Sequence, residues 1–229
     1  MILLSVVLLI SCKSPDSSKK LFNGKDLTGW TMKGNPKDVK QNYWTVKDGA
    51  ITLDTKGNKK HGPVWLQYNQ EFSDFELSLE VKANPKFKGN SGIQVRSRWS
   101  DKENRMNGPQ IDLHPPAAWR TGMIYDETKT ARRWICPSMK NWKISKDKAA
   151  KGWKWNDAGW NTIKIVCKGL TIKTWVNGVV ISDFNGDGVL NDKGHKERNV
   201  GLKGFIYLQL HAGGEIFLQF KNIKVKELK

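Results

Sequence analysis

Cysteine is scarce in this sequence, which has three such residues, Cys12, Cys136 and Cys167. Cys12 belongs to an N-terminal segment considered below, so the other two can form one disulfide at most. No C-x-x-C spacing occurs in the chain. A scaffold held by several disulfides and a metal site built on closely paired cysteines are therefore both excluded.

Helical patterning is also missing, because no stretch repeats its apolar residues at helical spacing over three or more turns. Short alternating runs take its place, and Phe75 to Val81 has the pattern of a half-buried strand. Asp48-Gly49 and Asn177-Gly178 each join two such runs and suit tight hairpins. Many short strands without an internal repeat predict an all-β, antiparallel sandwich or barrel, and 229 residues suit a single domain.

Acidic residues are in the minority, with 22 Asp and Glu against 39 Lys and Arg and a formal net charge of +17. The lysines are scattered along the chain, and no recognised nucleic-acid module appears. We therefore predict no nucleic-acid partner. The positive charge favours attraction to anionic surfaces or acidic glycans instead.

Charged residues are absent from positions 1–12, and the apolar run MILLSVVLLIS is too short to span a bilayer. Leu9 to Cys12 resemble a bacterial lipobox, in which the signal is cut before a cysteine that becomes lipidated. We predict a lipoprotein signal over 1–12 with Cys12 as the lipidation site, a flexible tether over 13–20, and one domain over 21–229. The protein would then be extracytoplasmic and membrane-anchored, at the periplasm or outer membrane. A buried N-terminal strand is the alternative.

The stretch from Gly108 to Glu127 concentrates polar side chains on a strand-like frame. Gln110, Asp112 and His114 alternate with two aliphatic residues, so in a strand they share one face. The residues that follow and can converge with them are Trp119, Arg120, Tyr125, Asp126 and Glu127. Carboxylates, an imidazole and a guanidinium can therefore meet in one place.

A second polar strand is predicted between Gly89 and Trp99, where Gln94, Arg96 and Arg98 share one face by the same alternation. If this strand neighbours the one over 110–114, two polar rows lie side by side on one surface. The alternative is that the arginines are simply solvated.

Tryptophan is abundant, with 11 residues, and serves either to fill the core or to stack on sugars. The basic, Trp-rich segment from Lys129 to Trp160 is predicted to be a long loop. In that loop Trp134, Trp142 and Trp153 would be sugar-stacking platforms if they are exposed.

Five segments, in this order, resemble the 3-keto-disaccharide hydrolase domain family: LFNGKDLTGW, GNSGIQVR, GPQIDLH with TGMIYDE, WVNG, and GFIYLQLH ending in FKNIKVKEL. The resemblance covers about the whole mature chain. It implies a concanavalin A-like jelly roll of two packed sheets, a bacterial extracytoplasmic setting and activity on sugars. Arg96 matches the family arginine after GNSG, and Gln209 with His211 matches its LQ-x-H. Gln110 and Asp112 form Q-x-D where many relatives have E-x-Q.

Gln110 argues against an ordinary glycosidase, because that reaction needs two carboxyl groups and an amide cannot be a nucleophile. A 3-keto-glycoside allows another route, since its ketone acidifies the C2 proton, a base removes that proton and the C1 substituent leaves. The predicted roles are base for His114 or Asp112, oxyanion stabiliser for Arg96, and acid for Glu127 or His211. The predicted substrate-binding residues are Gln110, Arg98, Trp119, Tyr125, Asp126, Gln209 and His211.

Several of these residues have plain structural alternatives. His114 can cap the strand end, Asp112 can pair with Arg96 or Arg98, and Asp126 can be a turn residue. The cofactor is left open. A divalent metal ion would stabilise an enediolate, and its candidate ligands are His114, His211, Asp112 and Glu127. Separately, the segment Asp183 to Gly188 resembles the start of a calcium loop but is also a good turn.

The sequence thus supports two main hypotheses of different class. The first is a lipoprotein glycoside hydrolase or lyase that acts on 3-keto-glycosides. The second is a non-catalytic carbohydrate-binding module on the same jelly roll, since that fold serves both purposes. A binding module would show exposed tryptophan platforms around an uncharged floor. A basic scaffold or envelope interaction protein, the third hypothesis, would have no polar pocket.

Overall fold

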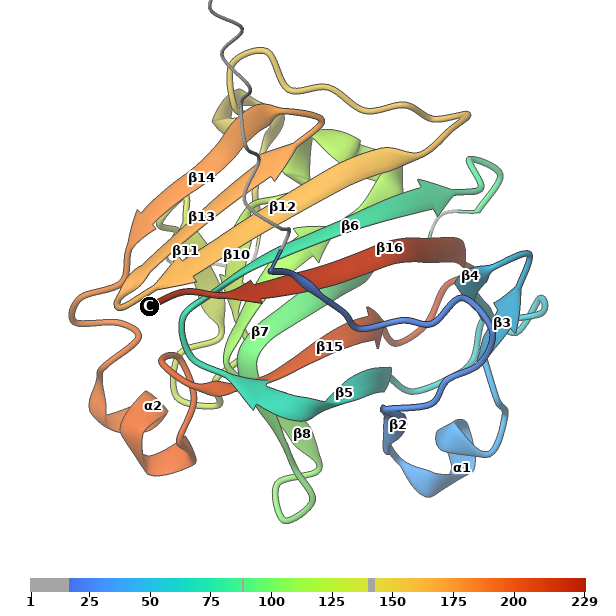
Figure 1. Cartoon of the computed structure of the whole chain (residues 1–229), viewed down its shortest axis with the longest axis horizontal. Coiled ribbons are helices and arrows are strands. Elements are labelled where there is room, and N and C mark those ends of the chain that lie inside the picture. Colours follow the sequence, from blue (N-terminus) through green and yellow to red (C-terminus); the bar gives the residue numbers. More distant parts are fainter. Residues whose placement is uncertain (1–16, 88, 140–142) are drawn as a thin grey trace, which may run out of the picture.

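Two antiparallel sheets pack face to face to form the protein (Figure 1). The structure is a computed structural model that describes residues 17–87, 89–139 and 143–229. The predicted signal over 1–12 with its Cys12, and Trp142, lie outside the described residues. The predicted all-β jelly-roll sandwich is confirmed.

The first sheet has the strand order β14-β13-β12-β6-β16-β4-β3, with β1 paired to β16. Its strands are β1 (Lys19–Lys20), β3 (Trp44–Lys47), β4 (Ala50–Asp54), β6 (Phe75–Ala83), β12 (Asn161–Lys168), β13 (Thr171–Val176), β14 (Val179–Asn185) and β16 (Phe217–Glu227). The C-terminal strand β16 lies between β6 and β4, in the middle of the sheet.

The second sheet has the strand order β11-β10-β9-β7-β15-β5-β2, with β8 paired to β7. Its strands are β2 (Trp30–Gly34), β5 (Val64–Phe72), β7 (Ser91–Ser100), β8 (Arg105–Asn107), β9 (Pro109–Leu113), β10 (Ile124–Asp126), β11 (Arg133–Cys136) and β15 (Gly204–Leu210). Strand β15 is likewise central, between β7 and β5.

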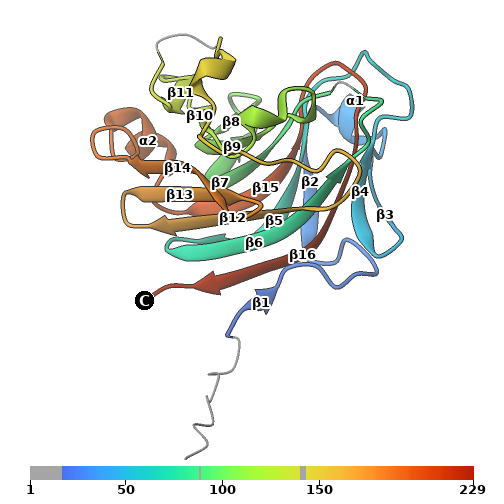
Figure 2. The ribbon, with the colours of Figure 1, turned by 90° about the horizontal axis from the view of Figure 1, so that it is seen from above.

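Helices are few and short: α1 (Pro36–Val39), η1 (Pro115–Arg120), η2 (Lys146–Lys148) and α2 (Lys193–Arg198). In the described ranges, no helix has the length and apolar character needed to cross a membrane. Figure 2 shows the two sheets as stacked layers, with α1 and α2 at the margins.

Alternation along the strands builds the core between the sheets. In β6 the apolar residues Phe75, Leu77, Leu79 and Val81 are buried, while the polar residues between them are partly exposed. Strands of the second sheet contribute the facing layer, for example Ile111 of β9. Removal of this apolar surface from water is the main force that holds the two sheets together.

Two predicted hairpins have the expected backbone. Asp48 and Gly49 have φ values of 52° and 71°, and Asn177 and Gly178 have 49° and 80°. Positive φ at both central residues gives the turn the twist that antiparallel strands need. Both pairs join adjacent strands, β3 to β4 and β13 to β14.

A bulge in β7 interrupts its alternation. Gln94 lies opposite Tyr207 of β15, and Ser97 lies opposite Phe205, so Val95 and Arg96 together face the single residue Ile206. Arg96 has the positive φ of 48° that accompanies this irregularity. The extra residue reverses the direction in which the following side chains point.

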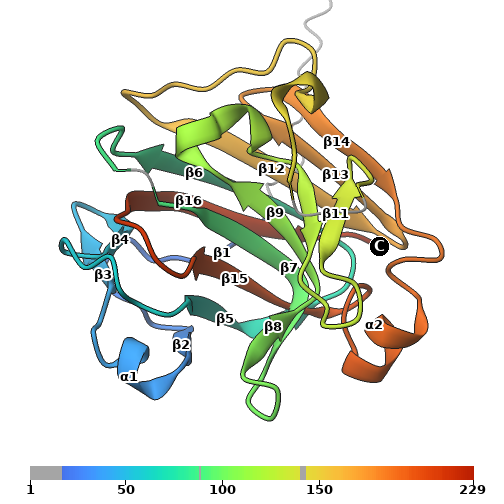
Figure 3. The same ribbon diagram turned by 180° about the vertical axis from the view of Figure 1, so that it is seen from behind.

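The outward face of the second sheet, which bears Gln94, Asp112 and Gln209, is called the site face below. These residues alternate with core residues such as Ile93, Ile111 and Leu208. Figure 3 views the protein from this side, with β9, β7 and β15 in front of the first sheet.

Candidate active site

Two rows of side chains cross the site face, because the residues of each row lie directly opposite one another on neighbouring strands. The first row is Trp65, Gln209, Gly92 and Asp112, on β5, β15, β7 and β9. The second row is Tyr207, Gln94, Gln110, Tyr125 and Trp134, on β15, β7, β9, β10 and β11. The predicted neighbouring of the two polar strands is therefore confirmed.

Asp112 forms an ion pair with Arg120 on this face. Its carboxylate accepts from Arg120 Nε at 3.0 Å and from Nη2 at 3.4 Å, and its side chain is only 2% exposed. Burial raises the pKa of Asp112 to about 6, even though the Arg120 charge opposes that change. The structural alternative, a pair with Arg96 or Arg98, is not formed, because η1 folds back and brings Arg120 to this carboxylate.

Arg120 also stacks on an aromatic pair. Its guanidinium lies 5.1 Å from the centroid of the Trp134 ring, which meets Tyr125 edge-on at 5.3 Å. Trp134 is only 2% exposed, so it cannot be the exposed sugar platform considered for the loop. It supports the arginine instead.

His114 caps η1, as the structural alternative expected. Its Nδ1 accepts a hydrogen bond from the backbone N–H of Ala117 at 3.0 Å. Burial, followed by the Arg120 charge, lowers the pKa of His114 to about 4, so the imidazole is neutral at pH 7. A neutral imidazole carries one proton, which must then sit on Nε2. His114 can therefore donate a hydrogen bond from Nε2 but cannot act there as a base.

His211 has the opposite arrangement. Its Nδ1 lies 2.8 Å from the carbonyl oxygen of Ala212, which can only accept, so Nδ1 carries the proton. Partial loss of hydration lowers the pKa of His211, and the Arg120 charge lowers it further. The side chain nevertheless keeps contact with solvent. The Nε2 lone pair of neutral His211 is therefore available as a base.

Glu127 lies two residues beyond Tyr125, and its backbone N–H bonds to Gly108 O at 3.0 Å. Its carboxylate, 14% exposed, lies 3.5 Å from Arg132. Burial raises the pKa of Glu127, which outweighs the lowering effect of Arg132 and Arg105. The Glu127 charge in turn contributes to the raised pKa of Asp112. Glu127 thus retains a proton to a higher pH than an ordinary glutamate.

Amide side chains occupy the middle of the site face. Gln94 Nε2 donates to Gln110 Oε1 at 2.7 Å, and both side chains are buried. A Cβ at position 92 would lie 2.5 Å from Gln110 Cδ, so Gly92 makes room for Gln110 to lie across the sheet. The predicted positions of Gln110 and Gln209 on this face are confirmed, while their contact with substrate stays a prediction.

The remaining predicted aromatic residues are partly buried. Trp119 lies on η1, one residue before Arg120, and Tyr125 lies in the second row. Trp153 is half-buried, with the Lys146 ammonium 5.8 Å from its ring centroid. Their binding to a sugar stays a prediction.

Arg96 does not lie on the site face, which corrects its predicted role as an oxyanion stabiliser. The bulge in β7 turns its side chain away, and it is completely buried. Its guanidinium donates to the carbonyls of Ser73, Gly169 and Gly201 and to the Asp74 carboxylate at 2.8 Å. Arg96 therefore joins three loops of the sandwich.

Arg98 follows the bulge in β7 and is engaged by three partners. It forms an ion pair with Glu71, donates to Asn199 O at 2.7 Å and stacks over Phe205 at 5.3 Å. These partners lie beyond the bulge and hold the Arg98 side chain there, and its contact with substrate stays a prediction.

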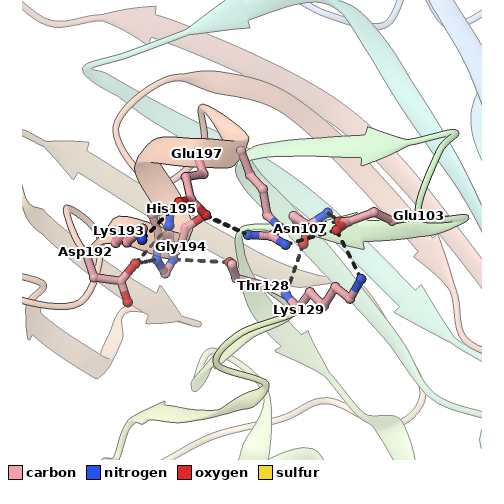
Figure 4. Close-up of polar contacts among 10 residues, drawn as sticks. Glu103, Asn107, Thr128, Lys129, Asp192, Lys193, Gly194, His195 and Glu197 are labelled. Atoms are coloured by element: carbon pink, nitrogen blue, oxygen red, sulfur yellow. Dashed lines mark hydrogen bonds and ion pairs between the residues drawn. The ribbon is translucent and has the colours of Figure 1, made fainter.

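Asp126 lies on the other side of β10 from Tyr125 and Glu127, because adjacent strand residues point to opposite faces. It is fully buried, 3.4 Å from Nε2 of His195. Figure 4 shows the other contacts of His195, with Thr128 and Asp192. Burial alone would lower the pKa of His195, but the two carboxylates outweigh it and raise that pKa. The predicted contact of Asp126 with substrate is therefore wrong. His195 is a structural partner that sequence patterns did not indicate.

The predicted metal ligands do not form a metal site. No group of three or more His, Cys, Asp or Glu side chains in the described residues is arranged to hold an ion. Asp112 has a guanidinium as its partner, and neutral His114 carries its proton on Nε2, so neither side chain has a lone pair free for an ion without losing its partner or proton. The residues present therefore do not fit a divalent ion, and no step is derived through one.

The calcium-loop pattern over Asp183 to Gly188 forms a turn. Asn185 Oδ1 accepts from the Asp187 backbone, and Asp187 Oδ1 accepts from Gly188 and from the Asn191 amide. The Asp183 carboxylate pairs with Lys173 at 2.6 Å. The turn alternative accounts for this segment.

Comparison with known proteins identifies the family of this chain. The family model described as "3-keto-alpha-glucoside-1,2-lyase-like domain" matches residues 17–226. A protein of Bacteroides thetaiotaomicron named 3-keto-disaccharide hydrolase is 27% identical over 238 residues, which cover 91% of this chain and 77% of the relative.

Two solved structures show the same fold. One, from Parabacteroides distasonis and called a "putative glycosyl hydrolase", has a TM-score of 0.63 at 20% identity, over 93% of this chain and 95% of its own. A carbohydrate binding module from Bacillus subtilis has a TM-score of 0.54 at 14% identity, over 87% of this chain and 96% of its own. Because the family model spans nearly all described residues, the chain belongs to the 3-keto-alpha-glucoside-1,2-lyase-like domain family.

Proposed function

We propose that this protein cleaves 3-keto-glycosides by removing the C2 proton and expelling the C1 substituent. The observation that carries the proposal is the opposite hydrogen bonding of two imidazoles, His114 and His211, whose pKa values the Arg120 charge lowers. His114 presents an N–H donor at Nε2, and His211 presents a lone pair at Nε2. A proton abstraction that creates an oxyanion needs one group of each kind.

The first step takes the proton at C2. His211 Nε2 accepts it, and the electron pair of the broken C–H bond moves through C2 and C3 to the ketone oxygen, which gives an enediolate. His114 Nε2–H donates to that oxygen. Arg120, held by Asp112, supplies positive charge beside it. Arg120 thus takes the role of oxyanion stabiliser that the sequence predicted for Arg96.

The second step breaks the C1–O bond. The enediolate electrons re-form the C3 ketone while a C1=C2 double bond forms, and the glycosidic oxygen leaves with a proton from Glu127. The raised pKa of Glu127 lets it keep that proton to a higher pH than an ordinary glutamate. Addition of water across C1=C2 then completes a net hydrolysis.

We expect the purified protein to release the aglycone from a 3-keto-glucoside and not from the matching unoxidised glucoside. In D₂O, elimination followed by hydration places one solvent deuterium at C2 of the released sugar, which mass spectrometry detects. The 3-keto sugar incubated without enzyme controls for spontaneous exchange. Release without deuterium at C2 would contradict proton abstraction.

The second candidate is a carbohydrate-binding module without catalysis. The same assay distinguishes it from the enzyme, because a binding module would bind glycans and release no product. Burial of Trp134 and the titratable groups on the floor favour the enzyme. Gln110, Tyr125, Trp119 and Gln209 stay proposed sugar contacts in either case.

We further propose that Cys12 carries a lipid that anchors the protein at the periplasmic or outer membrane. The support is the lipobox-like sequence and the short tether, which ends where Lys19–Lys20 pair with β16. Cells grown with labelled palmitate should yield a labelled protein, and Cys12→Ser should remove the label. Equal labelling of this variant and the wild type would refute the anchor.

A further inference from the structure

A second aromatic cluster lies outside the core between the sheets. Trp65, Tyr207 and Met106 are buried together, with Trp99 and Phe205 packed against them. Trp65 lies between the core residues of β5, and Tyr207 between those of β15, so both project onto the site face. The half-buried Trp99 ring lies 5.0 Å from that of Trp65. Trp99 and Phe205 are the partly exposed members of the cluster, and a partly exposed indole such as that of Trp99 can stack on a sugar ring.

Two polar atoms beside this cluster lack hydrogen-bond partners. In the part of the chain that the structure describes, Trp65 Nε1 and Gln209 Oε1 are buried and unpaired. The residues are 5% and 2% exposed and lie directly opposite one another on β5 and β15. Unpaired buried polar atoms destabilise a fold, so such a pair points to a ligand group.

The two atoms have complementary chemistry. The indole Nε1 can only donate, and the amide Oε1 can only accept. A sugar hydroxyl does both, so one hydroxyl can accept from Trp65 and donate to Gln209. A ketone oxygen cannot satisfy Gln209, because it has no proton to give.

The position of the pair suits a second sugar. Gln209 is in the same row as Asp112, with Gly92 of β7 between them. Two strand spacings separate Gln209 from Asp112 by roughly 10 Å, and Trp65 is one strand further away. Because Gly92 has no side chain, none projects from β7 between Gln209 and Asp112 in this row. A disaccharide can therefore span from Asp112 to Trp65.

We propose that Trp65, Gln209 and Trp99 form a second subsite that binds an unoxidised pyranose linked to the reacting 3-keto sugar. This rests on the proposed function for the identity of the reacting unit. The proposed reacting groups place the 3-keto ring at Asp112, which leaves the unoxidised ring at Trp65.

The binding test uses ¹⁵N-labelled wild-type protein with maltose, cellobiose and methyl glucoside as unoxidised probes. The Trp65 indole signal is identified by its loss in Trp65→Phe. We expect a disaccharide to shift it and Trp65→Phe and Gln209→Met each to weaken binding roughly fivefold, the effect of one hydrogen bond. Trp175→Phe, on β13 of the first sheet, is the matched control and should bind normally. An unmoved Trp65 signal with both disaccharides would overturn the subsite.

A kinetic test separates this subsite from the proposed reaction. With a 3-keto-disaccharide, Trp65→Phe should raise KM roughly fivefold and leave kcat unchanged. With methyl 3-keto-glucoside it should change neither. Equal effects on both substrates would refute the subsite alone, whereas absence of turnover with both would refute the proposed function and leave the binding test valid.

Discussion

Replacing His211 with alanine should lower kcat for 3-keto-glycoside cleavage by about 10²- to 10⁴-fold, the usual contribution of a general base. The neutral imidazole is the active form, and its pKa is lowered from the ordinary value. Wild-type activity should therefore fall as the pH drops through that lowered pKa. His211→Ala should lose this acidic limb, which a pH profile of kcat/KM measures.

Two variants control for loss of packing. His211→Gln keeps a polar side chain without a basic nitrogen and should lose activity like the alanine variant. Added imidazole should restore part of the His211→Ala activity, because the side chain is open to solvent. His114→Ala should also lower kcat but keep the acidic limb. An unchanged pH profile in His211→Ala would rule out His211 as the base.

Arg96→Met should destabilise the fold by about 3 kcal/mol or more, because it leaves buried carbonyl groups and the Asp74 carboxylate without their hydrogen-bond donor. At roughly 2–4 °C per kcal/mol for a chain of this size, Tm should fall by about 6–12 °C. Calorimetry and urea denaturation measure both quantities. The kcat of the folded variant at 25 °C should stay at the wild-type value.

Arg98→Met is the matched control for that substitution. Its ion pair with Glu71 is partly exposed, so its removal should cost about 1 kcal/mol or less. A large loss of kcat in Arg96→Met at unchanged stability would contradict the structural role and return Arg96 to the reaction.

The sequence was sufficient for the strands and for part of the site. Alternation predicted that Gln110 and Asp112 share a face, and the structure places them there. Arg96 was misplaced because the same rule assumes a regular strand. A bulge at a non-glycine residue leaves no local signal in composition or spacing.

Other errors had different causes. Tyr125 and Asp126 are adjacent in a strand, so their side chains point to opposite faces. The sequence alone was therefore enough to exclude Asp126 from the face that bears Tyr125. The pairing of Arg120 with Asp112 depends on how η1 folds back, which the residues Pro115-Pro116 do not determine. The unpaired state of Trp65 Nε1 is purely a tertiary property.

The central positions of β15 and β16 govern when the fold can be completed. Strand β15 joins β7 to β5, and β16 joins β6 to β4, yet these two strands come after all their neighbours in the sequence. Until they are present, each sheet is two unconnected halves with open edges. Most contacts of the core are therefore made between distant parts of the chain, which is the topology of slow folding. The floor that holds Gln209 and Asp112 exists only once β15 has inserted.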